Sequence, residues 1–304
     1  MPDTNINTSA LSTPLIDTHC HLDCEPLYTQ LDQMLCCARK SGIGGFVVPG
    51  VHPDNWPRIL QLAAQQPDLH AALGIHPMHV LKADSQCLSR LEELAKHCVA
   101  IGEIGIDPDF DPPLDVQVTV FRSQLQIAAR LGLPVIIHCR SKFQMTLQIM
   151  KEEAIQHVGG IMHAFSGSRE MALEFIRLGF CISFSGSLTW PGSKRLRKLA
   201  CQLPLDAVVL ETDAPNMAPQ TYKGQINQPT WLMDVFLELC ALRSESPGQI
   251  ANATLANTLR VLPKLCGSVP MQPAARHKSL DTAAVTGGNY EKGRHFGYLG
   301  SHHA

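Results

Sequence analysis

The 304-residue chain has no long apolar run and no strong net charge. No stretch approaches the roughly 18 apolar residues of a membrane span. The N-terminal residues contain no basic region followed by an apolar run, so we expect neither a membrane anchor nor a secretory signal. The formal net charge of −2 excludes a general attraction to nucleic acid, so any polyanionic substrate must meet local basic groups. These absences predict a cytoplasmic protein with no obligate protein partner.

The sequence also lacks the spacing of a disulfide framework, although it contains eleven cysteines. Cys36 and Cys37 are adjacent, and Cys20, Cys139 and Cys181 lie in apolar segments that we predict to be strands. We therefore expect reduced thiols in the core of an intracellular protein.

Eight short apolar runs recur along the chain, and a segment with helical periodicity follows nearly every one. The runs span residues 15–20, 45–48, 70–75, 99–104, 134–139, 160–164, 181–185 and 207–210. Strands that alternate with helices indicate a parallel sheet, and eight such units in about 250 residues match a (β/α)8 TIM barrel. The alternative is an open doubly wound sheet, but the phosphate loop or glycine-rich fingerprint that usually opens that fold is missing.

We divide the chain into three segments. Residues 1–14 form an N-terminal extension and residues 15–267 form the barrel. Residues 268–304 are rich in Gly, His and Lys, contain Pro270 and Pro273, and show no sustained periodicity. We therefore predict a flexible C-terminal tail.

Polar residues follow six of the eight runs, at the end where a barrel carries its functional face. The first run, "LIDTHCHLD", ends in His19 and His21, which would share one face of a strand. The other runs end in His76 of "GIHP", Glu103 of "GEIGID", His138 and Arg140 of "IIHCR", His163 and Ser166 of "MHAFSGS", and Glu211 and Asp213 of "LETDAP". A single strand-end histidine is usually structural, but this set at one rim indicates a metal centre.

The set exceeds the needs of one tetrahedral ion and suits two divalent ions about 3.5–4 Å apart. An imidazole-rich site should prefer Zn, Mn or Fe over Mg, although the identity of the ions stays open. The predicted ligands form three groups: His19, His21 and Asp213 on one ion, His138 and His163 on the second, and Glu103 as the bridge.

This arrangement predicts hydrolysis by a metal-bound hydroxide, since oxygen between two ions is ionised near neutral pH. Glu103 and Asp213 are the predicted catalytic carboxylates. Asp213 would take a proton and later pass one to the leaving group. Glu211 is expected to point elsewhere and to orient other ligands without binding an ion.

The motifs "DTHCHLD", "GIHP", "GEIGID", "VIIHCR", "HAFSGS" and "ETDAP", in this order and spacing, resemble those of the TatD family of metal-dependent hydrolases, most closely its bacterial branch. The resemblance runs from about residue 15 to residue 265. It implies a TIM barrel of the amidohydrolase-like type, a divalent metal centre and ester hydrolysis, with deoxyribonuclease activity known for some members. It implies the same six metal ligands, and it suggests that His76 and Arg140 face the substrate phosphate. We add Ser166 to the predicted substrate-binding residues.

One departure from the family pattern bears on the substrate. DNase members often carry a basic residue just before Asn-x-Pro in the loop after the eighth strand, where this chain has Ile226. The other basic groups are Lys142, Lys223 and the run "KRLRK" at 194–198, which is either a solvated helix face or a border of the mouth.

Three functions remain open at this point. The first is a phosphodiesterase acting like an exonuclease on DNA ends or single strands, which Arg140 favours. The second is a hydrolase of a small ester, phosphoester or C–N bond, which Ile226 and the acidic net charge favour. The third is a non-enzymatic binding protein whose barrel has lost its catalytic activity. The complete set of predicted ligands argues against this third function.

Overall fold

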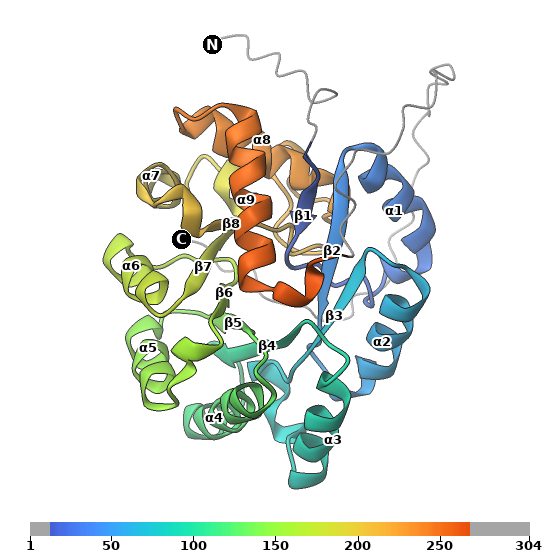
Figure 1. Cartoon of the computed structure of the whole chain (residues 1–304), viewed down its shortest axis with the longest axis vertical. Coiled ribbons are helices and arrows are strands. Elements are labelled where there is room, and N and C mark those ends of the chain that lie inside the picture. The colour runs from blue at the N-terminus through green and yellow to red at the C-terminus, as the bar shows by residue number, and fades with distance from the viewer. Residues whose placement is uncertain (1–12, 268–304) are drawn as a thin grey trace. The chain divides into compact units, whose positions relative to one another are not determined.

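The computed structural model describes residues 13–267, so the predictions for residues 1–12 and for the tail lie outside the described residues. Eight parallel strands form one sheet in sequence order (Figure 1). They are β1 (Leu15–Asp17), β2 (Ile43–Pro49), β3 (Leu69–Leu73), β4 (Ala100–Ile106), β5 (Val135–Cys139), β6 (Gly160–Met162), β7 (Phe180–Phe184) and β8 (Val208–Leu210). The amide of Thr18 donates to the Leu210 carbonyl at 3.1 Å, which brings β1 to β8. The predicted TIM barrel is confirmed.

Helices follow the strands and surround the barrel (Figure 1). The α-helices are α1 (Leu31–Lys40), α2 (Trp56–Gln65), α3 (Ser85–Ala95), α4 (Leu114–Leu131), α5 (Phe143–Glu152), α6 (Arg169–Arg177), α7 (Lys194–Gln202), α8 (Leu232–Leu242) and α9 (Pro247–Val261). The 3-10 helices are η2 (Tyr28–Gln30), η3 (Pro53–Asn55), η4 (Pro77–Lys82), η5 (Ile155–His157), η6 (Gly186–Thr189), η7 (Leu205–Ala207), η8 (Gln220–Tyr222), η9 (Pro229–Trp231) and η10 (Pro263–Leu265). Across residues 13–267, none of these helices combines the length and apolar character needed to cross a bilayer.

Helix α9 and η10 close the end of the barrel where the strands begin. Leu255, Val261 and Leu265 pack in one apolar cluster with side chains from the strands, such as Val47 and Val209. The Lys264 ammonium donates to the Cys98 carbonyl at 2.9 Å, just before β4. The opposite end, where the strands finish, is therefore the open face of the barrel.

Four strands, β1, β3, β6 and β7, end one to three residues earlier than the apolar runs predict. β1 ends at Asp17, so His19 and His21 follow the strand and do not lie in it. The reason is that neighbouring amides bond in different directions, Thr18 to Leu210 of β8 and Cys20 to Val47 of β2. β3 and β6 likewise end at Leu73 and Met162, two residues before the ends of their runs. β8 ends at Leu210, as its run predicts.

The cysteines are only partly core residues. All eleven are free thiols, as predicted, and Cys20, Cys98, Cys139, Cys181 and Cys240 are buried. Cys36, Cys37, Cys201 and Cys266 are exposed, so the expectation of a purely internal set is wrong for these four. Cys36 and Cys37 lie on the outer side of α1, where an amphipathic helix faces solvent.

Candidate metal centre

The six predicted ligands converge at the open end of the barrel. Their nitrogen and oxygen atoms, together with those of His76, form overlapping groups in which all members lie within 4.8 Å of one another. Five of the six residues are buried, and the His138 side chain is 20% exposed. The groups are His19 with His163 and Asp213, His19 with His21 and Glu103, and His76 with Glu103 and His138.

The Glu103 carboxylate lies between two sets of imidazoles. Its Oε2 atom is 3.3 Å from His19 Nε2 and 3.7 Å from His21 Nε2. Its Oε1 atom is 2.9 Å from His138 Nδ1 and 3.6 Å from the Nε2 atoms of His76 and His163. One carboxylate therefore faces both sides of the cluster, as a bridging ligand must.

Glu103 and His138 meet where β4 pairs with β5 and leaves no room for a side chain at Gly105. Gly105 of β4 pairs with His138 of β5. A Cβ atom on Gly105 would lie 1.8 Å from the His138 carbonyl oxygen, and the residue has φ +156°. Only glycine satisfies both conditions, so the second glycine of "GEIGID" positions the carboxylate against the imidazole.

The spacing of the first group fits a metal ion. His19 Nε2 and His21 Nε2 are 3.2 Å apart, and they lie 3.7 Å and 3.5 Å from Asp213 Oδ1. Two atoms that bind one ion at about 2.0–2.1 Å in tetrahedral geometry are separated by roughly 3.4 Å. Nitrogen and carboxylate oxygen are also the donors that Zn, Mn and Fe accept. The residues present therefore fit a divalent ion.

Two buried carboxylates hold the outer nitrogens of ligand histidines. Glu211 Oε1 is 2.9 Å from His163 Nδ1 and accepts the Ala164 amide at 2.7 Å. Asp107 Oδ2 is 2.9 Å from His138 Nε2. For His138, an Nε2–H that donates to Asp107 leaves Nδ1 free for a metal. For His163, the close Glu211 carboxylate stabilises the ring by charge. Glu211 was predicted to orient ligands. Asp107 was missed, although it is the last residue of the "GEIGID" motif.

His76 differs from these two histidines. Its Nδ1 atom accepts the amide of Met78 at 3.3 Å, so the ring proton belongs on Nε2. Nε2 is the atom that faces Glu103. Burial lowers the pKa of His76 to about 3 despite the nearby Glu103 charge. The imidazole is therefore a neutral N–H donor directed at the centre, as expected for a group that contacts substrate.

The pKa values of the other histidines depend on burial and on the nearby carboxylates. Burial lowers the pKa of each imidazole, but nearby carboxylates outweigh it and raise the pKa of His21 to about 9, of His138 to about 9 and of His163 to about 10. His19 has a lowered pKa because it is buried beside His163. Burial alone would raise the pKa of Glu103, yet the surrounding histidines hold that pKa well below its usual range. A cation that binds here must displace protons.

A second layer of bonds fixes the segment that carries Asp213. Asp17 accepts bonds from the Thr212 amide at 2.9 Å, the Thr212 hydroxyl at 2.6 Å and the His19 amide at 3.2 Å. Asn227 Nδ2 donates to the Thr212 carbonyl at 2.8 Å. Asp213 itself has φ 58°, a left-handed conformation that a non-glycine residue adopts only when its surroundings enforce it. Neither Asp17 nor Thr212 is among the site residues predicted from the sequence.

The structure leaves Arg140 and Ser166 outside the cluster, on loops at the rim. The Arg140 side chain is 46% exposed, and its Nε atom lies 2.7 Å from Asp109 Oδ2. Ser166 is exposed, and its carbonyl accepts a bond from Arg195 Nη2 at 2.5 Å. Both residues follow strands that carry ligands, so they border the mouth without entering it.

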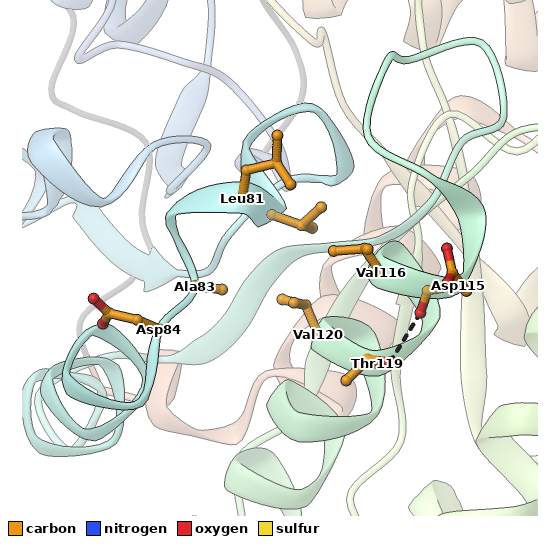
Figure 2. Close-up of a pocket in the computed structure, with 8 residues that line it drawn as sticks. Leu81, Ala83, Asp84, Asp115, Val116, Thr119 and Val120 are labelled. Atoms are coloured by element: carbon orange, nitrogen blue, oxygen red, sulfur yellow. Dashed lines mark hydrogen bonds between the residues drawn. The ribbon is translucent and has the colours of Figure 1, made fainter.

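A cavity of about 410 Å³ lies beside the centre and not in it. Figure 2 shows its lining between η4 and the first turns of α4, with Asp84 and Asp115 at its edges. Its other lining residues are Val80, Leu81, Ala83, Val116, Thr119 and Val120. Without a histidine or a convergent set of polar groups, this cavity has no share in the metal centre.

An eight-stranded barrel with histidines and carboxylates gathered at the open end is the arrangement of a metal-dependent hydrolase. Residues 16–263 match the family model described as TatD related DNase, and the chain belongs to the TatD family.

Three relatives show how far the likeness extends. The metal-dependent hydrolase YjjV of Escherichia coli is 37% identical over 80% of this chain and 95% of its own. Its crystal structure matches with a TM-score of 0.79 at 36% identity, over 82% of this chain and 98% of that one. YabD of Bacillus subtilis is 34% identical over 81% of this chain and 98% of its own. Human deoxyribonuclease TATDN3 is 30% identical over 84% of this chain and 97% of its own.

Proposed function

We propose that this metal-dependent hydrolase is a phosphodiesterase that degrades DNA from ends or single strands with two divalent ions. The observation that carries the proposal is the position of Glu103, whose two oxygens face separate groups of imidazoles. Sites with two ions about 3.5–4 Å apart are typical of phosphodiester hydrolysis. The name of the human relative, deoxyribonuclease TATDN3, supports DNA as the substrate.

The proposed ligand groups follow the contacts of the cluster. His19, His21 and Asp213 would hold one ion, together with Glu103. His138 and His163 would hold the second ion, with Glu103 shared between the two groups. The nitrogen donors favour Zn, Mn or Fe over Mg.

The bound ions would supply Lewis-acid polarisation of the phosphate and a lowered pKa for water. Asp213 takes the proton of the attacking water and returns one to the leaving oxygen, which a buried carboxylate at the cluster edge can do. The His76 N–H donates to a phosphate oxygen, and Arg140 binds the phosphate from the rim. We assign Ser166 to the substrate loop beside them.

A small ester or phosphoester is the second candidate substrate, with hydrolysis of a C–N bond as a variant of it. The observation that favours it is the pairing of Arg140 with Asp109, which neutralises the arginine nearest the ligands. Ile226, 49% exposed in the loop after β8, adds an apolar group to the same rim. A cytoplasmic location is favoured by the free cysteines, which suit a reducing compartment.

The test uses metal-stripped protein, end-labelled single-stranded DNA and separate additions of Mg, Mn and Zn. Metal-dependent shortening that Glu103→Ala and His138→Ala abolish is the expected result, and both variants should keep the circular dichroism spectrum of the wild type. An active Glu103→Ala protein refutes the bridging role. Tight metal binding with no cleavage of DNA, but with turnover of a small ester, favours the second candidate.

A further inference from the structure

The exposed charges around the mouth differ between its two halves. The mouth consists of the segments that join each strand to the first turn of the next helix. After β1–β4 these segments present mainly carboxylates, among them Glu25, Asp54, Asp84, Asp109, Asp111 and Asp115. After β5–β8 they present mainly cations, among them Arg140, Lys142, Arg169, Lys194, Arg195 and Lys223. The exceptions are Arg58 and Lys82 in the acidic half, and Glu170 and Asp234 in the basic half.

The loops after β6, β7 and β8 are hydrogen-bonded to each other, and the Phe143 ring at the start of α5 contacts Phe165 after β6 with ring centroids 5.0 Å apart. Arg195, in the first turn of α7, donates to the Ser166 carbonyl and so joins the loops after β6 and β7. The Trp190 indole donates to the Ala218 carbonyl at 2.9 Å and joins the loops after β7 and β8. The start of the basic run at 194–198 therefore borders the mouth.

Apolar side chains accompany the cations of the basic half. Ile226 after β8 is 49% exposed, and Met145 at the start of α5 is 38% exposed. Tyr222 stacks on Trp231 with ring centroids 3.9 Å apart, next to Lys223. The third large exposed apolar residue of the described chain, Leu81, lies in the acidic half beside the cavity of Figure 2.

We propose that the loops after β5–β8 bind the part of a single-stranded DNA chain that lies outside the scissile bond. The inference rests on the proposed phosphodiesterase function and specifies where the substrate strand lies. Single-stranded nucleic acid presents phosphates together with unpaired base faces, and a surface with both cations and apolar side chains matches it. An intact duplex hides its base faces, so Ile226 and Met145 would have little to contact. The carboxylates after β1–β4 repel phosphates and exclude the opposite path.

Lys194→Glu/Lys223→Glu tests this path, with Lys40→Glu/Lys96→Glu as the matched control. Both variants change the net charge equally, but Lys40 is the last residue of α1 and Lys96 is the first residue after α3, at the closed end of the barrel. The probe is a fluorescein-labelled phosphorothioate strand of about 12 nucleotides, titrated into metal-loaded protein at about 50 to 200 mM salt. Fluorescence anisotropy gives Kd at each salt concentration, and thermal melting verifies that each variant folds.

Loss of two phosphate contacts should reduce the slope of log K against log salt by roughly 1.4 and weaken binding about tenfold at low salt. The control should retain the wild-type slope and Kd. A mouth variant that binds like the wild type, a control that loses as much, or a wild type that binds no strand overturns the proposal. Cleavage of an ordinary phosphodiester strand is scored separately. A wild type that binds through these lysines but never cleaves refutes the phosphodiesterase function and not the binding surface.

Discussion

Replacement of Glu211 tests how the site holds its histidines. The carboxylate is buried, and its Oε1 atom contacts both His163 Nδ1 at 2.9 Å and the Ala164 amide at 2.7 Å. Its Oε2 atom has no hydrogen-bond partner among the described residues. Glu211→Gln therefore keeps an acceptor oxygen for both contacts and removes one negative charge.

Glu211→Gln should weaken metal binding more than it destabilises the fold. Removal of the carboxylate partner of a metal-binding histidine costs about 10- to 100-fold in affinity or activity, or about 1.4–2.7 kcal/mol. The new amide nitrogen replaces an oxygen that had no partner, so the free energy of unfolding should fall by at most about 2 kcal/mol. For a domain of this size that is roughly 4–8 °C in Tm.

Competition with a chromophoric chelator measures the Zn affinity of Glu211→Gln, and circular dichroism melting measures Tm. Glu170→Gln is the control, since it makes the same chemical change at an exposed position in the first turn of α6. A Glu211→Gln protein with wild-type Zn affinity and wild-type kcat refutes the assignment of Glu211 as the group that orients His163. A folded protein with weakened affinity supports it, provided that Glu170→Gln is unchanged.

Arg140→Ala should raise KM for phosphate substrates about tenfold and leave kcat within about twofold, since a half-exposed charged hydrogen bond contributes roughly 1.5 kcal/mol. Steady-state kinetics measure both constants, and an unchanged KM refutes the phosphate-binding role of Arg140. The affinity for Zn should rise with pH by about tenfold per unit for each displaced proton. Burial opposes protonation of His138 and His163, but nearby carboxylates raise their pKa to about 9 and about 10, so Zn must compete with protons below these values. Chelator competition at about pH 6 and 7 measures the Zn affinity, and an affinity that stays constant with pH contradicts this prediction. Gly105→Ala should lower the free energy of unfolding, measured in urea, by more than about 4 kcal/mol, because its Cβ would strike the His138 carbonyl. Gly248→Ala is the control and should not be destabilised in this way, because a Cβ at Gly248 enters open space.

The fold followed from the sequence because the strand pattern of a barrel is local. Eight apolar runs, each bounded by a helical segment, leave few topologies besides a (β/α)8 barrel. The residues that gather at the open end could also be found, because every strand of a parallel barrel ends at the same face. The points where strands stop were not predictable in this way. β1 ends before His19 because the Thr18 and Cys20 amides bond to different strands, a choice that depends on residues far along the chain.

The supporting carboxylates were less accessible to sequence reasoning. Asp107 lies at a strand end, where an aspartate is as easily a helix cap or a loop residue. Asp17 lies within an apolar strand, and its partner Thr212 is 195 positions away. Nothing local in the sequence distinguishes a buried acceptor of three hydrogen bonds from an ordinary polar residue. Their roles emerge only when the barrel brings β1 beside β8 and β4 beside β5.

The roles of the strand-end histidines depend on the partner of the outer ring nitrogen, which no motif records. Asp107 is an acceptor, so His138 donates outward and can present a lone pair to the centre. The Met78 amide is a donor, so His76 must accept outward and present an N–H. These two histidines at equivalent strand ends therefore differ: His138 would be a metal ligand and His76 a phosphate donor. We infer that the polarity of the outer hydrogen bond, set by Asp107 after β4 for His138 and by the Met78 amide for His76, distinguishes the two roles.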